Sequence, residues 1–117
     1  MNVRFKNDKL QKLCLTKKFQ KEHNLSAYKQ LQNLLFKLQA ASSMYEFWPE
    51  YSGKERCHEL KNKKHRDFRN HFSFTIIDKL RLIALPEEDW MASDPATRTW
   101  ADIHSITVVY AGDYHDD

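Results

Sequence analysis

The chain has 117 residues and a mass of 14.0 kDa, the usual size of one domain, so residues 1–117 are expected to share a single hydrophobic core. Hydrophobic residues make up 41% of the chain and charged residues 30%, a balance that excludes intrinsic disorder and leaves a highly charged surface. Only two glycines occur, Gly53 and Gly112, whereas P-loops and dinucleotide-binding loops need several glycines within one short segment. Both nucleotide-binding folds are therefore excluded.

The cysteine pattern and the absence of long apolar runs indicate the cellular compartment of the protein. Cys14 and Cys57 lack the paired spacing of a zinc site and are too few for a disulfide framework, so they predict free thiols in a reducing compartment. No His-x-x-x-His pair occurs, nor any acidic cluster flanked by histidines at helical spacing, and we expect no metal and no cofactor. No signal-peptide core is present, and no segment approaches the roughly 18 apolar residues that span a bilayer. The expectation is a cytoplasmic protein with no membrane partner.

Charge is distributed unevenly along the chain. Residues 1–72 hold 16 Lys and Arg against 7 acids, whereas residues 73–117 hold 3 against 9, so the net charge of +3 is the sum of +9 and −6. The densest basic stretch, residues 61–71, would attract a polyanion such as RNA in a salt-dependent way. The alternative is a solvated loop, because charge runs more often solubilise than bind. The candidate RNA or ribosome contacts in this stretch are Lys63, Lys64, Arg66 and Arg69.

The N-terminal part of the chain predicts one strand and two helices. Alternating apolar residues over 2–6 predict the strand. Asp8 is expected to cap a helix that runs to about Glu22. A second helix is expected over residues 26–41, capped by Ser26, because apolar residues recur at intervals of three and four: Ala27, Leu31, Leu34, Leu38 and Ala41.

An aromatic-rich segment follows the second helix. Residues 42–54 combine Ser, Pro49 and Gly53 with four aromatic residues, which predicts an ordered connection whose rings cover an edge of the core. The alternative is a platform on which nucleic-acid bases stack. The four aromatic residues are Tyr45, Phe47, Trp48 and Tyr51.

The remainder predicts strands arranged in an antiparallel sheet. Asp78-Lys79 is expected to join two of them in a hairpin, with a slightly longer turn as the alternative because the pair lacks glycine. Residues 86–102 are expected to form a surface excursion held in place by its tryptophans. The order of elements predicts an α+β fold, in which an N-terminal strand and two helices pack on a largely antiparallel sheet of four or five strands. The later strands are expected over residues 56–61, 72–77, 80–85 and 103–110 or beyond.

A polar cluster, Gly112-Asp113-Tyr114-His115, follows the final strand. RNA is cleaved without metal when one group deprotonates the ribose 2′-OH, cations stabilise the phosphate and an acid protonates the leaving oxygen, and these side chains suit such tasks. Arg81 adds a planar donor fork for phosphate. Taken singly, such residues are more often solvated or in surface ion pairs. Regular alternation would place Tyr114 and His115 on opposite faces, and a bulge at Gly112 would shift that phase.

Five short motifs occur in an order that resembles the HigB-like plasmid-maintenance killer branch of the RelE/ParE toxin superfamily. The resemblance extends over nearly the whole chain, and it agrees with the order of elements. The motifs are Lys9-Leu10-Gln11-Lys12-Leu13-Cys14, Leu38-Gln39-Ala40-Ala41, Arg56-Cys57-His58-Glu59-Leu60-Lys61, Leu80-Arg81-Leu82-Ile83 followed by Pro86, and Asp113-Tyr114-His115.

This resemblance implies a RelE-like fold and a bacterial toxin of a type II toxin-antitoxin pair. The toxin would be a ribosome-dependent endoribonuclease that cuts mRNA during translation, and a helix-turn-helix antitoxin of the HigA kind would neutralise it. Carried over by motif, Lys61 and Arg81 would contact the phosphate and the transition state, His115 would be the general acid or base, and Tyr114 and Asp113 would position it.

One position departs from the family pattern. The family usually has glycine after the His-x-Leu-Lys motif, and Asn62 stands there, a residue that tolerates left-handed backbone better than most. Two alternatives to the nuclease remain open. One is a non-enzymatic toxin of the ParE kind that binds DNA gyrase, and the other is a basic RNA-binding domain without catalysis.

Overall fold

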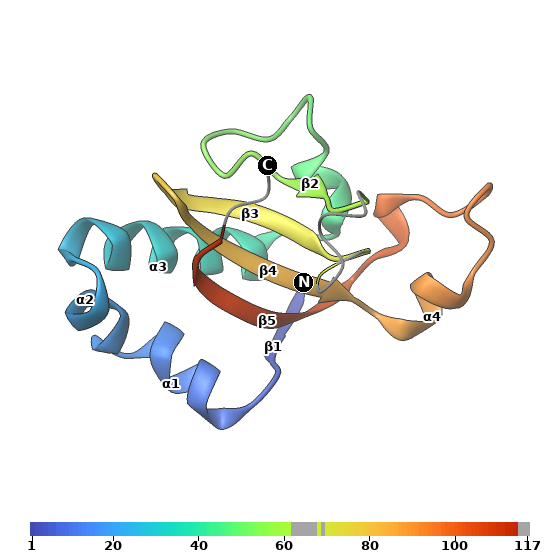
Figure 1. Ribbon diagram of the computed structural model, residues 1–117. Coiled ribbons are helices and arrows are strands. Elements are labelled where there is room, and N and C mark those ends of the chain that lie inside the picture. Colours follow the sequence, from blue (N-terminus) through green and yellow to red (C-terminus); the bar gives the residue numbers. More distant parts are fainter. Residues whose placement is uncertain (62–67, 69, 115–117) are drawn as a thin grey trace.

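The computed structural model describes residues 1–61, 68 and 70–114, and Figure 1 shows their arrangement. The sequence predictions for Asn62, His115 and the basic cluster lie outside these residues; the cluster is Lys63, Lys64, Arg66 and Arg69. Five strands form one sheet in the order β1-β5-β4-β3-β2, in which β1 pairs parallel to β5 and the other neighbours pair antiparallel. The strands are β1 (Asn2–Phe5), β2 (His58–Glu59), β3 (Phe72–Ile77), β4 (Leu80–Pro86) and β5 (Ser105–Asp113).

Helix α3 packs on one face of the sheet and lies behind it in Figure 1. The apolar stripe of α3 is buried together with the core-facing residues of β3 and β5, as its spacing predicted. Single turns of 3-10 helix, η1 (Met44–Phe47) and η3 (Trp100–Asp102), add Met44, Phe47 and Trp100 to this core. The α-helices are α1 (Asp8–Leu15), α2 (Lys18–Glu22), α3 (Leu25–Ala40) and α4 (Glu88–Ala92). Among the described helices none is long and apolar enough to cross a bilayer.

The helix expected from Asp8 to Glu22 is in fact two helices. Thr16 ends α1 because its hydroxyl donates to the carbonyl of Lys12 (2.6 Å) and accepts from the backbone N–H of Lys18 (3.2 Å). The predicted N-caps were also wrong, each by one or two residues. Asn7 and Asn24 cap α1 and α3, through side-chain oxygens that accept from backbone N–H groups at 2.9 and 2.8 Å.

The predicted hairpin is confirmed: β3 and β4 are joined by the turn Asp78-Lys79, with Ile77 opposite Leu80. Strand β2 is shorter than the predicted run over residues 56–61, because Arg56 adopts left-handed backbone (φ 43°) just before it. The N–H of Leu60 still donates to the carbonyl of His71, so pairing extends one residue past β2.

Strand β5 changes phase in its middle. Ile83 lies opposite Tyr110 while Ala84 lies opposite Val108, so Val109 is an extra residue that forms a bulge. Consequently Ile106, Val108 and Ala111 all reach the core. Tyr110 lies on the other face, although uninterrupted alternation predicted it beside Ile106 and Val108.

The excursion between β4 and β5 is held by its tryptophans, as predicted. Trp90 and Trp100 are only 6% and 8% exposed. The indole N–H of Trp90 donates to the carbonyl of Thr99 at 2.7 Å, which closes the loop across residues 93–98. The excursion is also more regular than expected, since it contains α4 and η3.

Candidate functional site

The face of the sheet opposite α3 carries several of the predicted site residues. Strand register aligns Thr75, Arg81 and Gly112 across three strands, and Ser73, Ile83 and Tyr110 in the next row. Because these rows alternate with the core-facing residues, their side chains lie on the second face. This face is therefore where the predicted Arg81 and the end of β5 come together.

Arg81 is held by the turn that precedes it. Its guanidinium Nη1 donates to the carbonyls of Asp78 (2.6 Å) and Leu80 (3.1 Å). A guanidinium has five N–H donors, so this anchoring leaves a positioned cation with donors to spare. Such an arrangement suits a phosphate group.

Three aromatic rings gather beside Arg81 at the end of β5. Phe68 contacts Tyr114 edge-on at 5.2 Å between ring centroids and Tyr110 at 5.7 Å, and the two tyrosines lie 6.3 Å apart. The hydroxyl of Tyr110 donates to the carbonyl of Asp113 at 2.8 Å. Burial, together with the Asp113 carboxylate, raises the pKa of Tyr110, which keeps the hydroxyl protonated as the donor.

Gly112 allows this arrangement because it has no side chain. A Cβ there would lie 3.1 Å from the hydroxyl oxygen of Tyr110, tighter than an ordinary contact. The bulge that sets the phase of this strand is at Val109 and not at Gly112, the position considered from sequence. Tyr114 follows Gly112 on the second face, and its N–H approaches the carbonyl of Lys79 at 3.4 Å.

Lys61 lies elsewhere. It follows β2, whose Glu59 pairs with Phe72 at the beginning of β3, whereas Arg81 pairs with Thr75 further along the same strand. At about 3.3 Å per residue the backbone positions of Lys61 and Arg81 are offset by roughly 15 Å along the strand direction. Strand pairing places Arg81 next to Gly112, with Tyr114 on the same face, whereas Asp113 lies opposite Leu80 in the adjoining row and Lys61 lies at the other end of the sheet.

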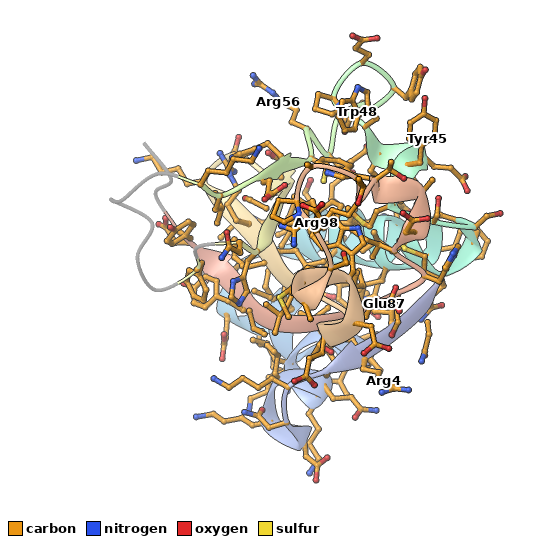
Figure 2. The ribbon with its side chains drawn as sticks, turned by 90° about the vertical axis from the view of Figure 1, so that its right-hand side faces the viewer. Arg4, Tyr45, Trp48, Arg56, Glu87 and Arg98 are labelled. Atoms are coloured by element: carbon orange, nitrogen blue, oxygen red, sulfur yellow. The ribbon has the colours of Figure 1, made fainter. Side chains whose placement is uncertain are left out.

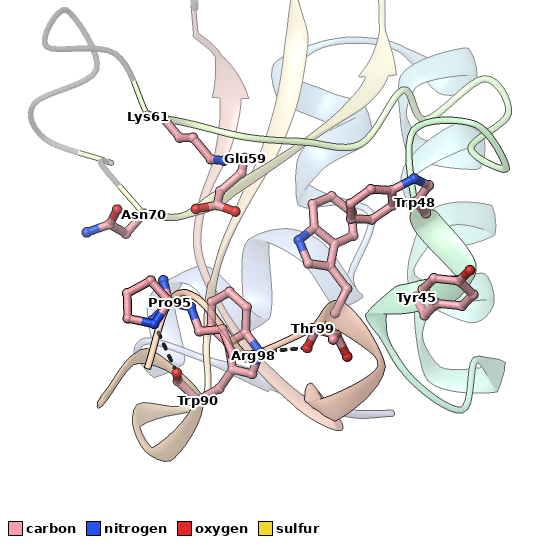
Figure 3. A pocket seen from close by; sticks show the side chains of 10 residues that line it. Tyr45, Trp48, Glu59, Lys61, Asn70, Trp90, Pro95, Arg98 and Thr99 are labelled. Atoms are coloured by element: carbon pink, nitrogen blue, oxygen red, sulfur yellow. Dashed lines mark hydrogen bonds between the residues drawn. The ribbon is translucent and has the colours of Figure 1, made fainter. Parts of the chain in front are cut away.

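Lys61 lines an open cavity of about 630 Å³, shown in Figure 3. The cavity lies between the end of β2, η1 and the excursion that contains α4 and η3. Figure 2 shows Tyr45, Trp48 and Arg98 on one side of the molecule. The lining residues are Tyr45, Trp48, Glu59, Lys61, Asn70, Trp90, Pro95, Arg98, Thr99 and Trp100.

Sequence reasoning missed the roles of Phe68, Tyr110 and Arg98. No periodic signal marks Phe68, and the bulge at Val109 hid the orientation of Tyr110. The aromatic segment did offer a signal for the cavity, through the alternative of a stacking platform at Trp48. In the described part of the chain, no three His, Cys, Asp or Glu residues gather in a metal-binding arrangement. Cys14 and Cys57 are buried free thiols, and burial raises the pKa of Cys14 to about 12.

Comparison with known proteins supports the fold. No protein-family model matches the sequence, and no curated protein matches it. Among solved structures, a chain of the YoeB-YefM complex from Staphylococcus aureus is similar, with a TM-score of 0.53 and 15% identity over 98% of this chain and 97% of that one. The predicted RelE-like α+β fold is thereby confirmed. Assignment to the HigB-like branch stays a prediction.

Proposed function

We propose that this protein is the toxin of a type II toxin-antitoxin system and acts as an endoribonuclease that cuts mRNA on the ribosome. The observation that carries the proposal is the fold shared, over nearly the full length of both chains, with a chain of the YoeB-YefM toxin-antitoxin complex. The anchored Arg81 supports the proposal, because a positioned guanidinium next to β5 suits a phosphate group.

The proposed reaction needs no metal. A base removes the proton of the ribose 2′-OH, the oxygen attacks the adjacent phosphorus, and the bond to the 5′-oxygen of the next nucleotide breaks as that oxygen gains a proton. Arg81 binds the phosphate and stabilises its additional negative charge. His115 is the proposed acid or base, and Asp113 and Tyr114 position it.

The partners follow from the same proposal. The basic residues of the segment after β2 bind RNA or ribosome, and Lys61 contributes at its beginning. The residues proposed for this contact are Lys63, Lys64, Arg66 and Arg69. A helix-turn-helix antitoxin of the HigA kind neutralises the toxin, and both act in the bacterial cytoplasm.

The test is mapping of mRNA 5′ ends in bacteria after brief induction of the wild type, His115→Ala, Arg81→Ala and Arg4→Ala. Arg4 is a matched control because it is an exposed strand arginine on β1, at the sheet edge opposite β2. New ends within translated messages are expected for the wild type and Arg4→Ala, and they are expected to disappear with the other two variants. Growth arrest without new ends, retained by His115→Ala, would replace the proposal with inhibition of DNA gyrase by a binding toxin of the ParE kind.

A further inference from the structure

The cavity at Lys61 contains all three tryptophans of the chain, yet the proposed cleavage chemistry does not use it. Its volume, about 630 Å³, falls within the range of roughly 300–1,000 Å³ typical of ligand pockets. In Figure 3, Lys61 and Glu59 lie on one side of it and Trp48 and Tyr45 on another. The proposed cleavage therefore explains neither the volume of this cavity nor the residues that line it.

Structural roles account for two of the tryptophans. Trp90 and Trp100 are buried, and each contacts the ring of Phe72 in the core. Trp48 is 38% exposed and Tyr45 46% exposed, so burial does not explain these two rings. Their planes are inclined by only 31° with centroids 6.3 Å apart, and Trp48 packs edge-on against Trp100 at 4.9 Å. The result is a supported aromatic surface at the rim of the cavity.

The charged groups of the lining favour an anion that carries a ring. Lys61 and Arg98 provide two cations against the single carboxylate of Glu59. The carbon Cζ of Arg98 lies 4.1 Å from the ring centroid of Trp90, in a cation–π contact that orients the guanidinium. Within the described residues, no ion pair engages Lys61.

Three acids of the excursion line a second cavity next to this one. Glu87, Asp89 and Asp102 line that cavity, which shares Trp90 and Arg98 with the aromatic cavity. Two of them also accept from backbone N–H groups, Glu87 from His104 at 2.6 Å and Asp102 from Thr99 at 3.3 Å. None of these three acids lines the aromatic cavity, whose own lining holds two cations and one carboxylate.

We propose that the aromatic cavity binds one unstacked base of single-stranded RNA, with Trp48 stacking on the base and Lys61 contacting its phosphate. This rests on the proposed function, which makes RNA the substrate. Aromatic rings stack on any base, and cations beside them track the backbone. The carboxylate of Glu59 and the amide of Asn70 supply hydrogen-bonding groups for the edge of the base. Because Arg81 lies opposite Thr75 of β3, whereas β2 pairs with the beginning of β3, the base belongs to a nucleotide other than the one cleaved.

The test uses intrinsic tryptophan fluorescence, because every tryptophan of the chain lines this cavity. Titration with a short oligoadenylate should quench the wild-type emission saturably, without ribosomes. Trp48→Ala should weaken binding by about five- to 100-fold, the range that stacking of one base supports. Lys61→Ala should lower both the affinity and its dependence on salt.

Two further variants separate stacking from loss of structure. Trp48→Phe keeps a ring and should recover most of the affinity that Trp48→Ala loses. Phe36→Ala is the control, since Phe36 is 73% exposed on α3, does not line the cavity and should leave binding unchanged.

The outcomes distinguish this inference from the proposed function. If the oligoadenylate fails to quench, or if Trp48→Ala binds as tightly as the wild type, the cavity is not a base site, even where Arg81-dependent cleavage is found in cells. Quenching by a peptide of the antitoxin but not by the oligoadenylate would also overturn it, in favour of a protein-binding cavity. Trp48-dependent binding of RNA by a protein that cuts no mRNA would keep the base site and overturn the nuclease.

Discussion

Nη1 of Arg81 lies 2.6 Å from the carbonyl oxygen of Asp78, so the cation of β4 is fixed by the turn that joins β4 to β3. Two structural facts thereby depend on each other. The geometry of the turn positions the guanidinium of Arg81. The guanidinium in return donates hydrogen bonds to the carbonyls of Asp78 and Leu80 in the same hairpin.

Arg81→Lys is expected to lower mRNA cleavage about 100-fold, although the positive charge is kept. A lysine ammonium has one donor centre, so it cannot hold the turn carbonyls and also present a planar fork to the phosphate. The measurement is the rate of appearance of new mRNA ends after induction. Equal rates for Arg81→Lys and the wild type would show that charge alone suffices.

Asp78 is expected to limit stability through its backbone. Its φ is 50°, a left-handed conformation that glycine adopts without a steric cost. Asp78→Gly should therefore change the free energy of unfolding by less than about 1 kcal/mol, whereas Asp78→Val should lower it by about 1–2 kcal/mol. Urea denaturation measures both. A valine variant as stable as the wild type would mean that the turn rearranges without loss of stability. The cleavage rate of that variant would then show whether the rearranged turn still positions the guanidinium of Arg81.

The order of elements was predictable because it depends on periodicity and turn chemistry along the chain. The stripe of α3 and the alternation of β3 are repeated several times, and each repeat reinforces the assignment. The caps were missed because Asn7 and Asp8 are both good capping residues, and only the hydrogen bond to Leu10 distinguishes them.

The candidate site was less predictable, because one residue decides which way several others face. The bulge at Val109 is a property of pairing between β4 and β5, and no feature of the β5 sequence alone requires it. The motif around Lys61 likewise gave its neighbours in sequence but not its distance from Arg81, which is set by the short pairing of β2 with the beginning of β3. Spatial convergence of this kind depends on tertiary contacts.

Glu55 is expected to make stability depend on pH. Its side chain is buried, and burial acts to raise its pKa. The hydrogen bond from Lys37 Nζ at 2.8 Å and that from the N–H of Gly53 at 3.2 Å outweigh burial, so the pKa of Glu55 lies below its ordinary value. A lowered pKa in the folded state stabilises the fold above the unfolded-state pKa, and this contribution is lost as pH falls through the folded-state pKa.

Glu55→Gln should therefore lower the free energy of unfolding by about 1–2 kcal/mol at neutral pH, with a smaller difference from the wild type in acid. Urea denaturation of both proteins across the acidic range measures this. Glu46→Gln is the control, because Glu46 is an exposed acid whose carboxylate accepts from the nearby N–H of Ser42. If the free energy of unfolding of Glu55→Gln stays below that of the wild type by the same amount at every pH, the loss comes from packing and not from charge.

Trp90→Phe is expected to loosen the excursion without unfolding the domain. Phenylalanine keeps a ring against Phe72 and beneath Arg98, but it cannot donate to the carbonyl of Thr99, the 2.7 Å bond that closes the loop. Because Thr99 is exposed and this bond is only partly buried, its loss should cost less than the roughly 1–3 kcal/mol of a fully buried group. The variant should show faster limited proteolysis between α4 and η3, with only a small fall in the global free energy of unfolding.

Because Trp90 also lines the aromatic cavity, weaker oligoadenylate binding should accompany the loosening of the excursion. Proteolysis unchanged from the wild type would show that ring packing alone holds the excursion.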